Sequence, residues 1–441
     1  MDRFFHSVTL DKDKCKGCTN CIKRCPTEAI RVRGGKAVIM SERCIDCSVC
    51  IRVCPYHAKK ARPDPIESIE KFKYKIALPA PTLYGQFNNL DDIDTVLTGL
   101  KKIGFDHVFE VSRGAEIISE ATRRVMSEGK IPKPVISSAC PAVVRLIRVR
   151  FPDLCENVLP LKAPMETAAI MAKREAHEQT GLPLGDIGVF FITPCAAKVT
   201  DIKMPIGIEH SAVDGAIAIS DIYPALVGAM NKLDGHTESL SHSGIIGVGW
   251  AGIGGESAAL LNEQYLAADG IENVIKVLEE LEDERLSELD FIELNACPGG
   301  CVGGVFTVEN PYVARARIQK LRKYLPVSCN HLSGEAIPSQ LKWTSELEFA
   351  PVLNLADNVV EAMERMTQAQ GIAESLPGLD CGSCGAPSCR ALAEDIVLGQ
   401  AKESDCIFKM RERIQSIANQ LTEIEGYVPH PSISPKESDS Q

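Results

Sequence analysis

Short apolar runs alternate with amphipathic segments through the middle of the chain. The runs have the length of buried strands, and the amphipathic segments repeat apolar residues every three or four positions, as a helix does. The strand-like runs include 135–136, 189–192 and 291–294, and the helical segments include 116–126 and 168–178. Strands that alternate with helices are typical of α/β folds. We therefore predict that residues 75 to about 330 fold around parallel sheets.

The C-terminal end of the chain is predicted to be mostly helical. Residues 346–370 have a helical pattern. Beyond them, seven apolar residues are spaced by steps of three and four, which is the seam of a coiled coil. They are Ile407, Met410, Ile414, Ile417, Leu421, Ile424 and Val428. We predict a parallel two-helix contact and hence a homodimer; the alternative is one amphipathic helix that packs on its own domain. Residues 429–441 are polar and rich in proline and serine, which predicts disorder.

The composition is that of a globular protein and limits the partners it can have. The 441 residues are 45% hydrophobic and 24% charged, which suits about two to four domains. No apolar run is long enough to span a bilayer, and residues 1–6 do not resemble a signal peptide. We therefore expect a cytoplasmic protein without a membrane partner. The net charge of −11 argues against nucleic acid as a partner.

The 18 cysteines are the unusual feature of this composition, and metal ligation explains them better than disulfides do. Eight of them repeat the spacing C-x2-C-x2-C-x3-C-P at an interval of 29 residues. In this run the fourth cysteine ligates the cluster of the other copy. We therefore predict two 4Fe–4S clusters, one held by Cys15, Cys18, Cys21 and Cys54 and the other by Cys44, Cys47, Cys50 and Cys25. A zinc site or a buried thiol cluster is the alternative. Residues 1–60 resemble a dicluster ferredoxin.

A second group of cysteines near the C-terminus has the spacing C-x2-C-x4-C-x16-C. It consists of Cys381, Cys384, Cys389 and Cys406. The first three lie on a predicted loop, and the fourth follows a predicted helix at 390–402. Residues 376–406 resemble the small four-cysteine iron–sulfur domain of some electron-transport and corrinoid proteins. Four thiolates suit zinc as well as an iron–sulfur cluster, so both metals stay open, with iron–sulfur favoured by the other clusters.

The third group is dispersed, but its members share one position, a loop directly after a strand-like run. Cys140 follows 135–136, Cys195 follows 189–192, and Cys297 and Cys301 follow 291–294. The carboxyl ends of strands are where α/β sheets place their sites, and the glycines of the last loop let backbone approach a bulky group closely. From the residues alone these cysteines are either a buried cluster site or unconnected core cysteines.

The loops Ser137–Pro141, Thr193–Lys198 and Asn295–Gly304 resemble the three signature loops of FeFe hydrogenases. The resemblance covers roughly residues 75–330. It implies two α/β lobes with a six-iron H-cluster between them. It also implies that Cys140, Cys195, Cys297 and Cys301 hold the 4Fe–4S cubane of that cofactor. Cys301 would also bridge to a diiron unit that carries CO, cyanide and an azadithiolate.

The same resemblance assigns roles to residues around the diiron unit. Lys198 corresponds to the lysine that hydrogen-bonds a cyanide, a charge-assisted contact in a dry pocket; an ordinary surface lysine is the alternative. Pro194 would help to line that pocket. Ala80 and Pro81, followed by Thr82, resemble the family loop that covers the diiron unit.

The sequence departs from the family where protons should pass. Ala139 stands where the family has a cysteine that exchanges protons with the diiron unit, and a methyl group can neither donate nor accept one. Further along the relay, Leu159 falls at the family's serine and Arg123 at an outer glutamate, while Glu120 matches the inner glutamate. Thr193, Met165, Asn295 and Asp201 also differ from the residues usual in the family. Loss of one positioned acid or base costs on the order of 10²–10⁴ in rate. This combination resembles the sensory FeFe hydrogenases.

We therefore expect a multidomain iron–sulfur protein that interconverts H2 with protons and electrons slowly, in the cytoplasm of an anaerobe. The predicted parts are a dicluster ferredoxin (1–60), a linker (61–74), the H-cluster domain (75–345), a C-terminal 4Fe–4S domain (346–410), a helix (411–428) and a tail (429–441). They would hold the diiron unit and three 4Fe–4S clusters, or four if the C-terminal site holds iron. The redox partner would be a ferredoxin or a signalling protein. One alternative is a catalytic, ferredoxin-linked hydrogenase subunit, against which Ala139 argues. The other is a non-enzymatic iron–sulfur assembly protein, against which the dicluster motif argues.

Overall fold

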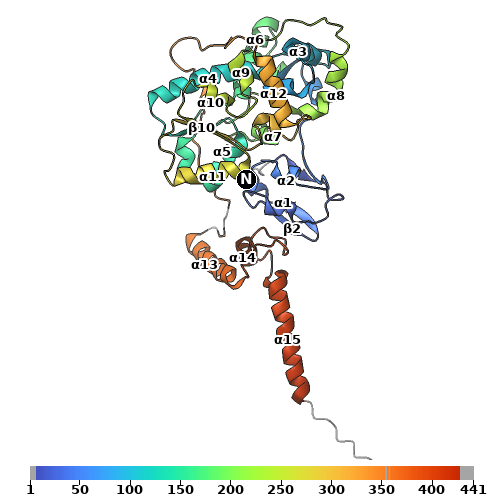
Figure 1. The fold of residues 1–441 in the computed structure, drawn as a ribbon, viewed down its shortest axis with the longest axis vertical. Coiled ribbons are helices and arrows are strands. Elements are labelled where there is room, and N and C mark those ends of the chain that lie inside the picture. Colours follow the sequence, from blue (N-terminus) through green and yellow to red (C-terminus); the bar gives the residue numbers. More distant parts are fainter. Residues whose placement is uncertain (1–5, 353–354, 357, 428–441) are drawn as a thin grey trace, which may run out of the picture. The chain divides into compact units, whose positions relative to one another are not determined.

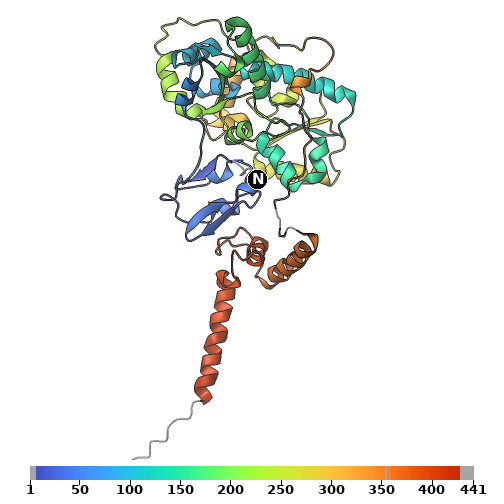
Figure 2. The same ribbon diagram turned by 180° about the vertical axis from the view of Figure 1, so that it is seen from behind.

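The computed structural model describes residues 6–352, 355–356 and 358–427, with side chains up to residue 424. Val428, the predicted tail and residues 1–5 lie outside this part. The chain divides into two compact units, Met1–Ile30 with Gly35–Val352, and Arg31–Gly34 with Leu353–Gln441. Among the helices that are described, none is long and apolar enough to cross a membrane. Figures 1 and 2 show the chain from opposite sides.

One lobe of the larger unit is built on a four-stranded parallel sheet in the order β6-β5-β8-β9. The strands are β5 (Tyr74–Pro79), β6 (His107–Val108), β8 (Ile187–Thr193) and β9 (Gly215–Ala218). Successive side chains of a strand point to opposite faces. Phe190 and Ile192 of β8 therefore pack with α3 (Ile93–Lys102) and α8 (Ile219–Met230). Phe191 packs on the other face with α6 (Pro164–Thr180). Helices thus cover both faces of this sheet (Figure 1).

The other lobe contains a three-stranded parallel sheet in the order β10-β11-β7. The strands are β7 (Val135–Ile136), β10 (Tyr265–Asp269) and β11 (Phe291–Asn295). Ile292 and Leu294 pack with α5 (Pro141–Arg150) and α11 (Ile271–Glu282), and Phe291 packs with α4 (Val111–Glu128). The two parallel sheets confirm the predicted α/β class, and the predicted strands and helices of this region fall within observed ones.

Shorter elements connect these parts. The helices are α7 (Ala196–Lys203), α9 (Ile245–Gly249), α10 (Gly255–Ala259) and α12 (Pro311–Arg322), and the 3-10 turns are η1 (Ser41–Arg43), η3 (Pro81–Gln86), η4 (Pro152–Asn157), η5 (Leu184–Asp186), η6 (Cys301–Gly303), η7 (Ser339–Leu341) and η8 (Glu403–Asp405).

The N-terminal region repeats a helix and a strand, as its duplicated motif leads one to expect. β1 (Val8–Leu10) pairs antiparallel with β4 (Lys59–Ala61), and β2 (Ile30–Arg33) pairs with β3 (Lys36–Ile39). The short helices α1 (Asn20–Lys23) and α2 (Val49–Arg52) each contain a ligand-motif cysteine. The segment 61–74 is extended around Pro65, but η2 (Ile66–Lys71) follows, because Ile69 is buried in the apolar core of the first lobe.

The smaller unit contains α13 (Val359–Ser375), α14 (Cys389–Val397) and α15 (Ile407–Tyr427). The prediction of a helix from residue 346 was wrong for its first half. Pro351 disfavours helical backbone before it, and Asn358 caps α13 by accepting a hydrogen bond from the N–H of Glu361 at 2.8 Å. The helix predicted to run to residue 402 ends at Val397, because Gly399 takes up a positive φ of 71°.

Candidate functional site

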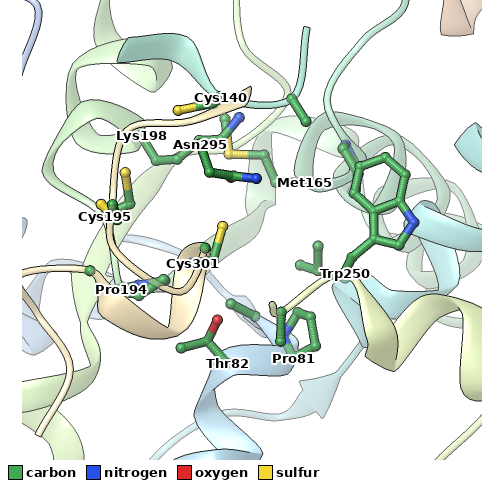
Figure 3. A pocket seen from close by; sticks show the side chains of 18 of the residues that line it. Pro81, Thr82, Cys140, Met165, Pro194, Cys195, Lys198, Trp250, Asn295 and Cys301 are labelled. Carbon is green, nitrogen blue, oxygen red and sulfur yellow. The ribbon is translucent and has the colours of Figure 1, made fainter. Parts of the chain in front are cut away.

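Three loops from the two lobes meet at one cavity. Each begins at the carboxyl end of a parallel strand: Cys140 follows β7, Cys195 follows β8, and Cys297 follows β11. The cavity is lined by all four dispersed cysteines and by the other residues assigned to this site, namely Ala80, Pro81, Ala139, Cys140, Pro194, Cys195, Lys198, Cys297 and Cys301. Figure 3 shows Lys198, Asn295 and Met165 on the cysteine side of the cavity and Pro81, Thr82 and Trp250 across it.

Local backbone structure explains how these loops hold their cysteines. Cys140 and Cys195 occupy the N-cap positions of α5 and α7, so that each helix carries its ligand at its first turn. In the third loop, Gly300 has a φ of 86°, a conformation in which other residues are strained. A Cβ atom at Gly304 would lie 2.1 Å from the carbonyl oxygen of Pro194. The second and third loops can therefore touch only because residue 304 is glycine.

Desolvation raises the pKa of three of these thiols, those of Cys140, Cys195 and Cys301. Desolvation, followed by the nearby thiol of Cys140, raises the pKa of Cys301 to about 12. Desolvation and neighbouring thiols also raise the pKa of Cys195 well above its usual value. The positive charge of Lys198 acts in the opposite direction and lowers the pKa of Cys301. Four thiols that line one apolar cavity have the donor chemistry of an iron–sulfur cluster, whose iron binds thiolate. The residues therefore fit the cubane.

Lys198 lies in the first turn of α7 and is largely buried, with 13% of its side chain exposed. Its Nζ is 3.4 Å from a carboxylate oxygen of Asp201, one turn along the helix. The ammonium group therefore lies at the wall of the cavity and forms a weak ion pair with Asp201. Such a geometry suits a donor to an anionic or polar ligand in the cavity.

The eight N-terminal cysteines line two further cavities. One is lined by Cys44, Cys47 and Cys50 together with Cys25. The other is lined by Cys15, Cys18 and Cys21 together with Cys54. Each motif thus contributes its fourth cysteine to the cavity of the other motif, which is the arrangement that the sequence analysis predicts for the ligands.

The C-terminal cysteines gather in the smaller unit. Cys406 is buried in an apolar cluster, with Cys384 and Cys389 packed against it. Burial raises the pKa of Cys384, and the thiols of Cys381 and Cys406 add to the effect. The four cysteines therefore lie in one region of the smaller unit.

The central part of the chain matches the family described as "Iron only hydrogenase large subunit, C-terminal domain", over residues 73–234 and 252–305. Residues 7–55 match a 4Fe-4S dicluster domain, and residues 376–408 match an Fe-S cluster domain. The chain belongs to the FeFe hydrogenase-like family.

Curated relatives are hydrogenases of low sequence identity. Iron hydrogenase 1 of Clostridium pasteurianum is 25% identical over 378 residues, which are 69% of this chain and 65% of that protein. The chain thus matches slightly less than two thirds of that relative. The periplasmic Fe hydrogenase large subunit of Nitratidesulfovibrio vulgaris is 27% identical over 361 residues, 68% of this chain and 86% of that protein. Among solved structures, a variant of FeFe-hydrogenase HydA1 from Chlamydomonas reinhardtii has a TM-score of 0.48 and 16% identity, and covers 66% of this chain and 97% of that chain.

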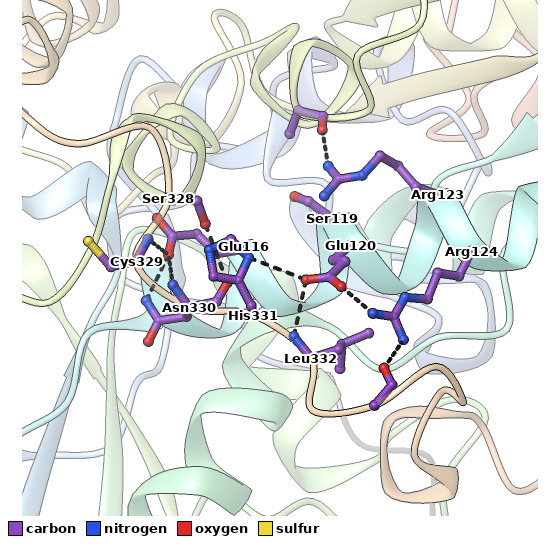
Figure 4. Close-up of polar contacts among 12 residues, drawn as sticks. Glu116, Ser119, Glu120, Arg123, Arg124, Ser328, Cys329, Asn330, His331 and Leu332 are labelled. Atoms are coloured by element: carbon purple, nitrogen blue, oxygen red, sulfur yellow. Dashed lines mark hydrogen bonds and ion pairs between the residues drawn. The ribbon is translucent and has the colours of Figure 1, made fainter.

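In this FeFe hydrogenase-like protein, the residues at the further relay positions are not among those that line the cavity. Figure 4 shows the contacts of Arg123 and Glu120. Leu159 is buried in an apolar cluster. Arg123 donates to the carbonyl of Ala259 at 2.5 Å. Glu120 pairs with Arg124 and accepts from the N–H of Leu332 at 3.1 Å. Desolvation raises the pKa of Glu120, but the Leu332 N–H and Arg124 outweigh it and lower the pKa below its usual value. Glu120 is therefore held in the ionised state.

The sequence analysis missed a pair of buried carboxyl groups behind Ala139. The hydroxyl of Ser137 donates to Glu256 at 2.6 Å and accepts from the N–H of Ala139 at 3.1 Å. Glu293 accepts from the side-chain amide of Asn295, which lines the cavity, at 3.1 Å. Desolvation and the charge of Glu293 raise the pKa of Glu256 to about 8. Glu256 therefore carries a proton at neutral pH. The sequence contained one indication of this pair, because Glu293 interrupts the apolar run 291–294.

Arg52 was also missed, because nothing in its own motif indicates its contact. One guanidinium nitrogen, Nη2, lies 3.1 Å from the sulfur of Cys297 and 2.7 Å from the carbonyl oxygen of Gly303. The other, Nη1, donates to the carbonyl of Cys47 at 3.3 Å. Arg52 thus joins the second ferredoxin motif to the third loop of the cofactor cavity.

Proposed function

We propose that this protein is an FeFe hydrogenase that interconverts H2 with protons and electrons slowly and serves to report on H2 rather than to supply electrons in bulk. One observation carries the proposal: the cavity keeps the four cysteines and Lys198, while Ala139 lines it at the position of the proton-carrying thiol. The protein would act in the cytoplasm of an anaerobe, with a ferredoxin or a signalling protein as redox partner.

The side chains of the cavity support binding of the complete H-cluster. Cys140, Cys195, Cys297 and Cys301 would hold the cubane, with Cys301 bridging to the diiron unit. Lys198 would donate to a cyanide, and Pro194, Ala80 and Pro81 would enclose the diiron unit in an apolar wall. When bound, the H-cluster supplies the site at which H2 is split or formed. The protein would supply ligands, orientation and exclusion of water.

The electron route is supported by the contact of Arg52. Its guanidinium group bridges the carbonyl of Cys47 and the sulfur of Cys297. This contact brings the two loops next to each other, and a short separation favours electron transfer between the two centres. We infer that electrons leave the cubane through the cluster of Cys44, Cys47, Cys50 and Cys25.

The proton route is supported by the contacts around Ala139. A methyl group cannot carry a proton, and Leu159, Arg123 and Glu120 make their contacts elsewhere. The carboxyl groups of Glu256 and Glu293, with Ser137 and Asn295, lie behind the cavity wall. They offer a second, less direct route, which accounts for activity that is slow rather than absent.

Infrared spectroscopy and turnover assays on the maturated protein test this proposal together. We expect bands from intrinsic CO and cyanide, with H2 turnover at least about 10²-fold below that of a hydrogenase with an intact relay. Ala139→Cys should raise turnover little, because Leu159 and Arg123 still interrupt the relay. Absence of the CO and cyanide bands would favour the assembly-protein alternative. Rates typical of catalytic hydrogenases, in the parent or in Ala139→Cys, would favour the catalytic-subunit alternative.

A further inference from the structure

A second cavity lies on the far side of the loop formed by residues 249–255. Trp250 and Ala251 of this loop line the cofactor cavity. Gly249, Gly252 and Gly254 line the second cavity instead, opposite helix α12. Figure 1 shows α9, which leads into the loop, beside α12. The loop therefore separates the cofactor cavity from a second space.

Two arginines of α12 form the charged wall of the second cavity. Arg315 and Arg322 are seven residues apart, so they lie on one face of the helix. Among the described residues, no carboxylate forms an ion pair with either of them. The Nε atom of Arg322 is buried and has no hydrogen-bond partner. By contrast, Arg317 and Lys320 of the same helix pair with Glu309 at 2.8 Å and Asp91 at 3.1 Å.

The Nε atom of Arg322 has lost water and gained no partner, and burying part of a charged group in this way is costly. Burial lowers the pKa of Arg322 and no neighbouring charge opposes it. The arginine nevertheless stays cationic, since its pKa starts above 12. The chain as a whole carries a net charge of −11, so the missing partner is not explained by a lack of acidic residues. An anion from solution would supply the counter-charge.

The glycines of the loop leave room for such an anion. A Cβ atom at Gly249 would lie 3.0 Å from the Cζ of Arg322, and one at Gly254 would meet nothing within 4 Å. The cavity has a volume of ≈ 120 Å³, whereas about 10–15 Å³ holds one water molecule. The N–H groups of Gly252, Ile253 and Gly255 donate to protein carbonyls. Recognition therefore falls to the guanidinium groups.

We propose that this cavity binds a phosphate-sized oxyanion between Arg315 and Arg322, either free phosphate or the phosphate group of a nucleotide. Two cationic groups balance the charge of a phosphate, and the planar guanidinium group donates to two of its oxygens at once. A chloride ion could not use both donors of each arginine in this way.

Bound anion would act on the cofactor loop, and this consequence rests on the proposed function. Val302 donates its N–H to the carbonyl of Ala251 at 3.0 Å, and Ile253 donates to Gly299 at 3.1 Å. The loop 249–255 is thus tied directly to the loop that carries Cys297 and Cys301. Neutralising two positive charges behind the cubane makes its reduction less favourable. The reduction potential of the cubane therefore falls when the oxyanion binds.

The test uses the full chain with its 4Fe–4S clusters but without the diiron unit. Inorganic phosphate, pyrophosphate and AMP are titrated separately by calorimetry and by phosphorus NMR. The variants are Arg315→Gln and Arg322→Gln, with Lys320→Gln as a control that removes the same charge from the same helix. We expect saturable one-to-one binding, weakened roughly tenfold or more in each arginine variant and unchanged in Lys320→Gln. Tighter binding of AMP than of phosphate would assign the site to nucleotides.

Two results would overturn the proposal. One is the lack of saturable binding of all three ligands below about 10 mM. The other is binding that Lys320→Gln weakens as much as the arginine variants do. Arg315 is exposed, so its variant is expected to fold even if Arg322→Gln does not. Because binding is measured without the diiron unit, a protein that lacked hydrogenase activity would leave this test unaffected.

Discussion

At the scale of single residues, Lys198 shows how the cavity could retain a ligand after the cysteines have bound theirs. Its ammonium group is largely buried and, among the described residues, forms its ion pair with Asp201, at 3.4 Å. We predict that Lys198→Ala lowers retention of the diiron unit roughly tenfold, because one charge-assisted hydrogen bond is lost, and spares the cubane. Iron content and infrared bands measure the two separately. Lys203→Ala is the control, since Lys203 lies on the same helix and pairs with Asp64. Equal loss in both variants would refute the role.

Arg52 should set the reduction potential of the cubane without contributing to its assembly. Its positive charge lies 3.1 Å from the sulfur of Cys297 and stabilises the more negative, reduced cluster. We predict that Arg52→Gln lowers the reduction potential of the cubane by on the order of 50 mV, the equivalent of about 1 kcal/mol. Redox titration followed by electron paramagnetic resonance measures it. Lys23→Gln is the control, because Lys23 holds the equivalent position in the first repeat. A matching shift in the control would point to overall charge instead.

Glu256 should make stability depend on pH. Its pKa is raised to about 8 in the folded protein, from an ordinary value of 4.5. The fold therefore favours the protonated form, and its contribution to stability is complete below pH 4.5 and is lost as the pH rises towards 8. We predict that Glu256→Gln removes this loss, so that the variant gains stability relative to the parent between pH 5 and about 8. Denaturant unfolding at several pH values measures it.

The control for this prediction is Glu272→Gln, which removes an exposed carboxylate from α11. It should leave the pH dependence of the parent unchanged. Turnover of the maturated Glu256→Gln protein adds a second measurement, because a proton route through Ser137 and Glu256 would make it slower still. A variant with the parent's pH profile would mean that Glu256 is ionised in the folded state.

At the scale of elements, the sequence predicted those whose pattern is local. The strand-like runs before Cys140, Cys195 and Cys297 appear as β7, β8 and β11, because buried parallel strands consist of continuous apolar residues. The ends of the helices were harder to predict from the sequence. α13 begins at Val359 because Asn358 caps it, and a cap depends on one side chain rather than on a periodic pattern.

The loops between those elements depend on glycines that touch backbone. A Cβ atom at Gly304 would lie 2.1 Å from the oxygen of Pro194, so the third and second loops would be forced apart. We predict that Gly304→Ala destabilises the protein by about 1–3 kcal/mol and lowers the iron bound by the cavity. Thermal unfolding and iron analysis measure these effects. Gly228→Ala in α8, where a Cβ meets nothing within 4 Å, should instead be neutral or stabilising by about 0.5–1 kcal/mol.

At the scale of the whole molecule, the site residues that the sequence predicted are those that motif spacing names. All nine residues assigned to the H-cluster line one cavity, although they come from four separate stretches of chain. Arg52 and Cys297 are 245 residues apart, and the Ser137–Glu256 hydrogen bond joins two loops 119 residues apart. Such contacts arise only when distant parts of the chain pack together, and no local pattern encodes them. The proton and electron routes were for this reason less predictable than the ligands.

The last prediction concerns assembly. The described heptad residues of α15 are exposed; Ile414, Leu421 and Ile424 each leave 57–60% of their surface accessible. An apolar seam of this kind is stable in water only when something covers it. Its strict heptad spacing suits a second copy of the same helix, so we predict a parallel homodimer. Three heptads alone are marginal, and the four-cysteine domain next to the helix would add to the contact.

Light scattering on the full chain at micromolar concentration, and on a chain that lacks residues 411–441, measures the state of assembly. We expect a dimer for the first and a monomer for the second. Ile417→Lys should also give a monomer, because it places a charge in the seam, whereas Asn419→Lys, on the opposite face of α15, should stay dimeric. A full-length chain that is already monomeric would exclude the dimer. A redox change at the four C-terminal cysteines would then have no second copy to reach through α15.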